Sequence, residues 1–125
     1  MTNLPTNTGY KKLILYQKAK LLVVDIYHLT QKYPKTEIYG LVPQMRRCSV
    51  SVLANIVEGY AKGTSKEYSR FLSISIGSVF ELEVFLDLSL DLLFIKQVDF
   101  DKILNLFNEV KKLLYGTRKA VRLKG

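Results

Sequence analysis

The sequence predicts an all-α fold, an antiparallel up-down bundle of four helices. Apolar residues recur every three or four positions in four long segments, at about residues 11–32, 39–60, 65–94 and 99–123. The segments between them are short, so successive helices should run antiparallel. No stretch shows the apolar–polar alternation of a strand. A length of 125 residues suits one domain, and we expect residues 1–125 to form it, with a flexible N-terminal segment over residues 1–10.

The first helix is predicted over about residues 11–32. Tyr33 and Pro34 should end it, because the residue before a proline is disfavoured in helical geometry. The apolar spacing indicates one buried face along this helix. The residues on that face are Leu15, Ala19, Leu22, Ile26 and Leu29.

The second helix is predicted over about residues 39–60. Pro43 fits only the first turn of a helix, so the helix should begin near Gly40. Gly59 and Gly63 are typical of a C-terminal helix end. The residues expected to face inward are Leu41, Met45, Cys48, Ser49, Val52, Ile56 and Tyr60.

The third helix should begin with a capping box, in which the side chains of Thr64 and Glu67 satisfy each other's exposed backbone amides. It is predicted to end near Phe94. Its inward-facing residues are Tyr68, Leu72, Ser75, Val79, Leu82, Leu86, Ser89 and Leu93.

The fourth helix is predicted over about residues 99–123, with Asp99 as its N-cap. The apolar residues on its inward face recur at helical spacing. They are Ile103, Phe107, Val110, Leu114 and Val121.

The third helix carries more apolar residues than one bundle can bury. A second apolar set falls roughly opposite its inward face. Surplus apolar surface favours subunit association, so we expect a homo-oligomer. The alternative is a thick bundle in which aromatic side chains of neighbouring helices cover this set. The expected interface residues are Ile76, Phe80, Val84 and Leu88.

Polar residues recur along one side of the second helix. Half-buried polar groups need partners, and Glu81 or Glu83 of the third helix could pair with Arg47. We expect a polar network between helices or subunits; the alternative is an anion-binding seam using Arg46 and Arg47. The network residues are Arg47, Ser51, Asn55, Glu58, Glu81 and Glu83.

The sequence contains no recognisable catalytic or cofactor motif. His28 is the only histidine and has no second His or Cys at metal-ligand spacing. Cys48 lies on a predicted core face, which favours a buried structural thiol. Phosphate-binding glycine loops and hydrolase motifs are also missing. We expect no enzymatic activity, no cofactor and no metal ion.

The chain is strongly basic, with 19 Lys and Arg against 11 Asp and Glu and a formal net charge of +8. This charge favours polyanionic partners, although basic residues also suit the C-terminal ends of helices. A lone cysteine and the lack of a signal peptide or membrane span favour a reducing, cytoplasmic location without membrane contact. The candidate nucleic-acid-binding residues are Arg46, Arg47, Lys62, Lys66, Arg70, Lys111, Lys112, Arg118, Lys119 and Arg122.

Several motifs in the second and third predicted helices match those of a known family. Residues 39–41 read YGL, residues 46–52 RRCSVSV and residues 54–59 ANIVEG; residues 65–72 read SKEYSRFL and residues 77–83 GSVFELE. These stretches resemble the four-helix-bundle proteins encoded by intervening sequences of bacterial 23S rRNA genes, and the resemblance covers about residues 13–95. It implies a homo-oligomeric ring, typically a homopentamer, without an established catalytic residue. It also implies a relation to accessory variability proteins of diversity-generating retroelements, which bind nucleic acid and a reverse transcriptase.

Two functions therefore stay open. The first is a non-enzymatic basic oligomer that binds RNA or DNA. The sequence does not interleave aromatic and basic residues as single-strand binders do, so this binding should have low sequence specificity. The second is a protein-interaction scaffold, such as an accessory subunit of a reverse transcriptase.

Overall fold

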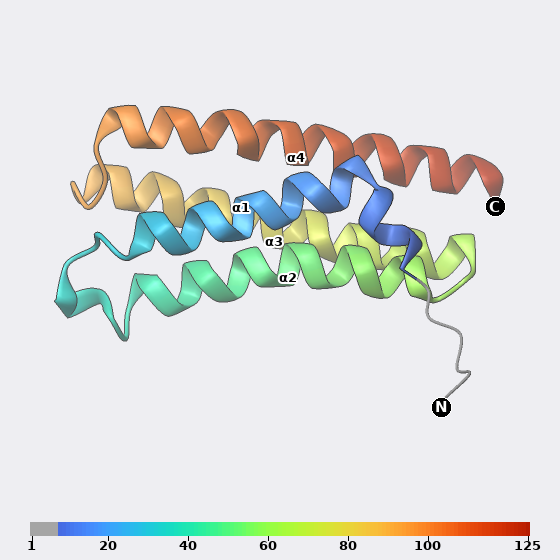
Figure 1. Cartoon of the computed structure of the whole chain (residues 1–125), viewed down its shortest axis with the longest axis horizontal. Coiled ribbons are helices and arrows are strands. Elements are labelled where there is room, and N and C mark those ends of the chain that lie inside the picture. The colour runs from blue at the N-terminus through green and yellow to red at the C-terminus, as the bar shows by residue number, and fades with distance from the viewer. Residues whose placement is uncertain (1–7) are drawn as a thin grey trace.

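The computed structural model describes residues 8–125, which form four α-helices and two short 3-10 helices (Figure 1). The described residues include no strand, so the prediction of an all-helical fold with four helices is confirmed. The predicted flexible segment over residues 1–10 falls mostly outside the described residues. The elements are η1 (Gly9–Lys12), α1 (Ile14–Thr30), η2 (Lys35–Glu37), α2 (Leu41–Ala61), α3 (Ser65–Asp91) and α4 (Gln97–Lys124).

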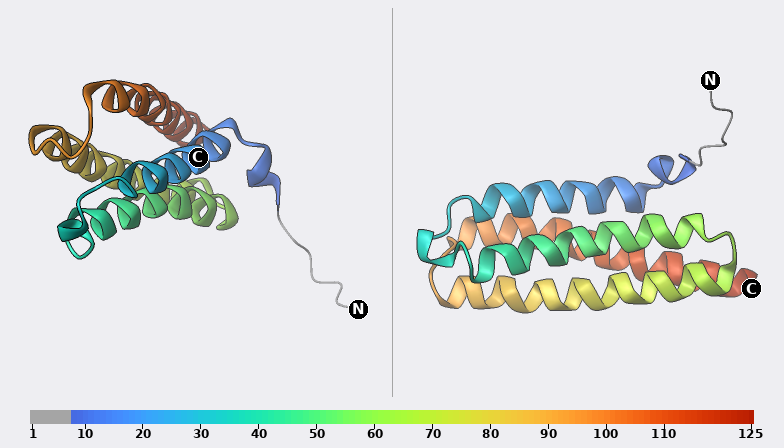
Figure 2. Two further views of the ribbon diagram at one scale, coloured as in Figure 1. Left: turned by 60° about the vertical axis from the view of Figure 1, so that its left-hand side comes forward. Right: turned by 90° about the horizontal axis from the view of Figure 1, so that it is seen from below.

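The four helices lie side by side, and each points in the opposite direction to the one before it along the long axis (Figures 1 and 2). This arrangement brings η1, the α2–α3 turn and the C-terminal part of α4 to one end of the bundle. The α1–α2 and α3–α4 connections lie at the other end. Residues far apart in the sequence are therefore neighbours at both ends.

The core is made by the inward faces that the helical spacing predicts. All five predicted positions of α1 are buried, from Leu15 to Leu29. Phe107 and Leu114 of α4 are fully buried as well. The buried Ser75 hydroxyl donates to the Val52 carbonyl oxygen at 2.7 Å, so this polar group joins α3 to α2 without an unsatisfied donor.

The capping contacts at the starts of α3 and α4 differ from those predicted. The Thr64 hydroxyl accepts a hydrogen bond from the Glu67 N–H at 3.2 Å, as the capping box requires, but the Glu67 carboxylate binds Arg70 at 2.7 Å. The N-cap of α4 is Lys96, so the prediction that Asp99 is the N-cap is wrong. Asp99 lies in the first turn, where its charge still favours the positive end of the helix dipole.

The α3 helix ends at Asp91, before the predicted Phe94, in a left-handed turn. The Phe94 N–H donates to the Ser89 carbonyl at 2.9 Å and the Leu93 N–H to the Leu90 carbonyl at 3.0 Å, which is a Schellman motif. Leu93 has a φ of 63° and is 87% exposed. Its predicted place in the core is therefore wrong, because the helix ends at Asp91 and the left-handed turn at Leu93 points this side chain outward.

The second apolar set of α3 divides into buried and exposed members. Ile76 is only 6% exposed and belongs to the core, which corrects its predicted place on the outer side. Phe80, Val84 and Leu88 are 44%, 55% and 43% exposed. Neighbouring helices of the same chain therefore leave these three side chains about half exposed to solvent.

Candidate nucleic-acid interface

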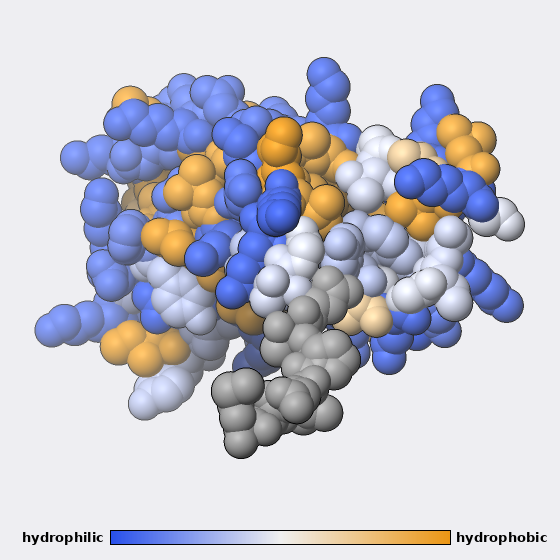
Figure 3. All heavy atoms as spheres, turned by 45° about the vertical axis from the view of Figure 1, so that its right-hand side comes forward, coloured by the Kyte–Doolittle hydropathy of each residue, from blue (hydrophilic) through white to orange (hydrophobic). Residues whose placement is uncertain are grey.

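Almost all of the net positive charge lies at one end of the bundle. We define the basic end as residues 9–17, 57–73 and 113–125, which meet around the α2–α3 turn (Figure 1). These segments contain nine Lys and Arg and two Glu, a formal charge of +7 out of the total +8. The remaining residues hold ten basic and nine acidic side chains. Figure 3 turns this end forward and shows strongly hydrophilic side chains projecting around an area of intermediate hydropathy.

The fold gathers some of the candidate binding residues and separates others. Arg46 and Arg47 lie near the start of α2, towards the opposite end, and Lys111 and Lys112 lie near the middle of α4. Lys11, Lys12 and Lys124 were not among the predicted candidates. The fold places η1 and the α4 terminus at the same end of the bundle, although they are far apart in the sequence. The candidates that meet at the basic end are Lys62, Lys66, Arg70, Arg118, Lys119 and Arg122.

Two arginines of α4 are held across α3 by serine hydroxyls. Arg118 Nη1 donates to Ser73 Oγ at 3.1 Å, and Arg122 Nε donates to Ser69 Oγ at 2.9 Å. A neutral hydroxyl orients a guanidinium without cancelling its charge. Both arginines therefore keep their full charge for an anionic ligand.

Arg70 has a different environment, because it forms an exposed ion pair with Glu67 at 2.7 Å. The hydrogen bond from Arg70 holds the pKa of the Glu67 carboxyl below its ordinary value. Exposed pairs of this kind are weak. A phosphate group can compete with Glu67 for Arg70.

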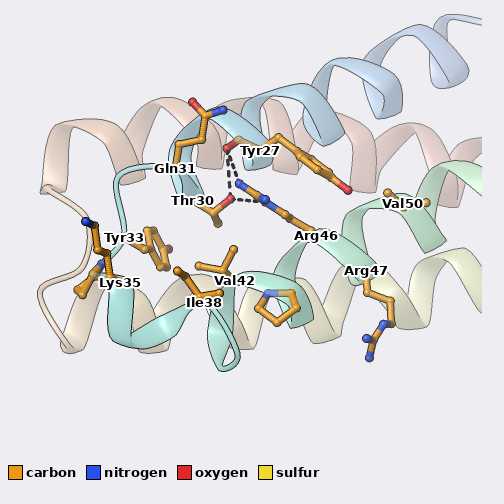
Figure 4. Close-up of a pocket in the computed structure, with 12 residues that line it drawn as sticks. Tyr27, Thr30, Gln31, Tyr33, Lys35, Ile38, Val42, Arg46, Arg47 and Val50 are labelled. Carbon is orange, nitrogen blue, oxygen red and sulfur yellow. Dashed lines mark hydrogen bonds between the residues drawn. The ribbon is translucent and has the colours of Figure 1, made fainter.

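Two candidates outside the basic end are engaged within the bundle. Arg46 Nε donates to the Thr30 hydroxyl at 3.0 Å and Arg46 Nη2 to the Tyr27 carbonyl at 3.3 Å, and its guanidinium lies over the Tyr27 ring (Figure 4). Lys111 pairs with Glu83 at 3.6 Å and lies over the Phe80 ring. The side chains of Arg46 and Lys111 are therefore held by contacts within the chain.

Arg46 also lines a hollow of about 620 Å³ between the end of α1, η2 and the start of α2 (Figure 4). Its walls are mainly apolar, with Ile38, Val42 and Val50 among them. The charged lining residues are all basic: Lys35, Arg46 and Arg47.

The predicted polar network forms in separate pieces. Ser51 and Ser78 share a hydrogen bond of 2.8 Å between α2 and α3, and Asn55 Nδ2 donates to Ser51 Oγ at 3.1 Å. Glu81 accepts instead from the Cys48 thiol at 2.8 Å. Within the described residues, no hydrogen bond or ion pair joins Arg47 to Glu81 or Glu83, and Glu58 lies on the exposed side of α2.

The Cys48 thiol is buried, and its environment suppresses ionisation. Burial, followed by the hydrogen bond to Glu81 and the charge of that carboxylate, raises the pKa of Cys48 to about 12. A thiol with such a pKa is a poor nucleophile.

Comparison with known proteins decides the relationship that the motifs indicate. The model of the family described as 23S rRNA-intervening sequence protein matches residues 11–116, which include all of α1, α2 and α3 and most of α4. The chain belongs to this family. The region that matches the 23S rRNA-intervening sequence protein family thus extends into the fourth helix, beyond the motifs at residues 39–83.

A solved structure shows the same fold. It is a protein of unknown function from the S23 ribosomal protein family of Bacteroides thetaiotaomicron VPI-5482, with a TM-score of 0.78 and 22% sequence identity over 85% of this chain and 96% of that chain. None of the curated proteins matches the chain.

Two further properties of residues 8–125 bear on other roles. None of the helices there is both long and apolar enough to cross a membrane. The same residues contain no group of three or more His, Cys, Asp or Glu side chains arranged to hold a metal ion.

Proposed function

We propose that this member of the 23S rRNA-intervening sequence protein family binds nucleic acid, RNA or DNA, through its basic end and acts without catalysis. The observation that carries the proposal is the concentration of +7 of the net +8 charge at one end of the molecule. Lys and Arg that neutralise phosphates release condensed counterions, and this release drives binding. Phosphate contacts carry no base information, so the binding has low sequence specificity.

Self-association would multiply this charge. Phe80, Val84 and Leu88 form an exposed apolar stripe on α3, and burying it between copies removes apolar area from water. We propose a homo-oligomeric ring, a homopentamer, built through this stripe. Five copies would carry about 40 positive charges in total.

A protein-interaction scaffold, such as an accessory subunit of a reverse transcriptase, is the second candidate function. Exposed apolar residues at the end opposite the basic end favour it. Tyr39 is 97% exposed and Leu93 87% exposed, and Leu93 adopts an unfavourable left-handed conformation. A protein partner that buries both side chains would account for their positions.

Two charge-matched triple variants test the proposed function. Lys62→Glu, Lys66→Glu and Lys119→Glu change the basic end, whereas Lys35→Glu, Lys96→Glu and Lys102→Glu make the same change of charge elsewhere on exposed lysines. Fluorescence anisotropy with a labelled oligonucleotide over a salt series measures affinity and the number of phosphates that the protein neutralises. We expect the basic-end variant to bind far more weakly. For duplex DNA, its salt dependence should be shallower by about 0.9 for each phosphate that it no longer neutralises.

Equal weakening by both triple variants would show that only net charge matters. Affinity that does not change with salt would contradict phosphate binding altogether. Capture of a protein partner after nuclease treatment, together with no binding of oligonucleotides, would support the scaffold instead.

A further inference from the structure

Four tyrosines from four separate elements meet at the basic end. The Tyr10 ring of η1 lies 5.0 Å from the Tyr16 ring of α1 and 6.4 Å from the Tyr60 ring of α2, measured between ring centroids. The Tyr60 ring lies 6.0 Å from the Tyr68 ring of α3. All three contacts are edge-to-face, and all four side chains are partly exposed. We call Tyr10, Tyr16, Tyr60 and Tyr68 the tyrosine cluster.

The end of the cluster on α2 and α3 borders a hollow of about 230 Å³. Tyr60 and Tyr68 line it together with Gly59 and Gly63 of the α2–α3 turn. Gly63 has a φ of 82°, and a Cβ atom built on it would meet nothing within 4 Å. The turn therefore leaves open space beside the two rings.

A glycine also sets the spacing of these rings. A Cβ atom on Gly59 would lie 2.7 Å from the Phe71 Cβ and 3.1 Å from a Tyr68 ring carbon. The absence of a side chain at Gly59 lets α2 approach α3 closely. This close approach places Tyr60 and Tyr68 side by side at the rim of the hollow.

Three lysines lie beside aromatic rings or the hollow at this end of the bundle. Lys124 of α4 lines the hollow, and Lys20 of α1 lies over the Tyr16 ring at 6.0 Å from its centroid. Lys62 follows Tyr60 by two residues at the α2 terminus and lies over the Phe71 ring at 5.6 Å. Aromatic and basic residues that are not interleaved along the sequence are therefore neighbours in space at this end.

This arrangement matches the chemistry of an unpaired nucleotide. A single strand presents free base faces that stack on aromatic side chains, while its phosphates follow the cations. In a duplex the base faces are already stacked on one another, so tyrosine rings have little to bind. We propose that the basic end binds single-stranded nucleic acid, with a base stacked on Tyr60 or Tyr68 and neighbouring phosphates on Lys62 and Lys124. The inference rests on the proposed function and deepens it.

The test compares a single strand of about 12 nucleotides with a duplex of the same length, by fluorescence anisotropy at one salt concentration. Tyr60→Leu removes a ring without changing the charge. We expect it to weaken single-strand binding about tenfold, which lies within the range that stacking on one aromatic residue supplies, and to leave duplex binding unchanged. Tyr60→Phe keeps a ring and should bind the single strand more tightly than Tyr60→Leu does.

Two further variants serve as a control and as a repeat of the test. Tyr39→Leu makes the same substitution at an exposed tyrosine of the opposite end and should change neither affinity. Tyr10→Leu alters the cluster from η1, so it repeats the test should Tyr60→Leu fail to fold. The chain has no tryptophan, so its intrinsic emission comes from tyrosine and should be quenched by a stacked base.

The outcomes separate the two proposals. If single strand and duplex bind equally and Tyr60→Leu and Tyr10→Leu weaken neither, base stacking is wrong while phosphate binding at the basic end stands. If neither nucleic acid binds, the proposed function and this inference both fail.

Discussion

The Glu37 carboxylate accepts a hydrogen bond from the Leu41 backbone N–H at 3.1 Å, across the start of α2. Gly40 lies beneath this contact: a Cβ atom there would come within 2.6 Å of Glu37 Oε1. Glu37 therefore acts as a cap from outside the helix, where the N-cap residue has no side chain to do so. The glycine of the YGL motif at residues 39–41 therefore leaves room for the Glu37 carboxylate.

Replacing Glu37 tests the cap. Glu37→Ala leaves the Leu41 N–H without its side-chain acceptor, and loss of a helix cap costs about 0.5–2 kcal/mol. Urea denaturation should show a decrease of that size in the free energy of unfolding. Glu58→Ala, on the exposed side of the same helix, should change it by less than about 0.5 kcal/mol; equal effects would mean that the Glu37 contact does not stabilise α2.

Leu93 offers the opposite case, a substitution that should stabilise the protein. Its φ of 63° is unfavourable for a residue with a side chain and ordinary for glycine. Leu93→Gly should raise the free energy of unfolding by about 1 kcal/mol, since the left-handed conformation costs a leucine about 1–2 kcal/mol and its 87% exposed side chain packs against little. Leu92→Gly, at a residue with a φ of −82°, should not stabilise it. A destabilising Leu93→Gly would show that the leucine side chain makes contacts that matter.

The Cys48 environment predicts a pH dependence. The thiol has a pKa raised from 9.0 to about 12 in the folded state, so the unfolded chain loses this proton at lower pH than the folded chain. The contribution to stability is fully present below pH 9.0 and is lost as the pH rises towards about 12. Cys48→Ser should therefore lose less stability than the wild type over this interval, as measured by chemical denaturation. Equal slopes would contradict a thiol held neutral by burial and Glu81.

The same geometry predicts the reactivity of the thiol. Glu81→Gln removes the carboxylate that raises the pKa of Cys48, whereas burial, the largest cause, remains. The variant should react faster than the wild type with a thiol-alkylating reagent at mildly alkaline pH, yet more slowly than a free thiol. Asp87→Asn, an exposed carboxylate of the same helix, should leave the rate unchanged.

The exposed stripe on α3 predicts the effect of a charge on assembly. Val84 is 55% exposed, so Val84→Glu should not disturb the fold of one subunit, which circular dichroism can verify. Light scattering coupled to size exclusion should show an oligomer for the wild type and a smaller species for Val84→Glu. Leu93→Glu, on an equally apolar but distant residue, is the control. A monomeric wild type at micromolar concentration would disprove association through this stripe.

Helix existence and inward faces could be predicted from the sequence because they depend on local spacing. Leu15 to Leu29 recur at helical period, and Pro34 and Pro43 restrict where α1 ends and α2 begins. The exact residues at which the helices begin and end were harder to predict from the sequence. Asp99 has the right chemistry for a cap and lies near the right place, yet the helix begins at Gln97 because Lys96 already adopts the extended conformation of an N-cap.

The candidate interface was only partly predictable, because charge in a sequence has no position in space. Arg46 and Lys62 both belong to the predicted second helix region and looked equivalent, but about four turns of helix separate them. Arg46 is engaged by Tyr27 and Thr30, whereas Lys62 lies at the basic end. The sequence did not indicate that Tyr10, Tyr60 and Tyr68 form a cluster, because their spacing along the chain follows no pattern.

The amino-acid sequence by itself determined four amphipathic helices, a surplus of positive charge and membership of a family. The helices follow from residues within a few turns of one another, and the net charge and the family match require no knowledge of where residues lie in space. Only the tertiary structure decided that η1, the α2–α3 turn and the end of α4 meet, because the helices reverse direction and side chains more than a hundred residues apart, such as Lys11 and Lys124, come to the same end. Packing between helices is not encoded in local spacing, and this packing brought basic residues from distant parts of the sequence onto one surface.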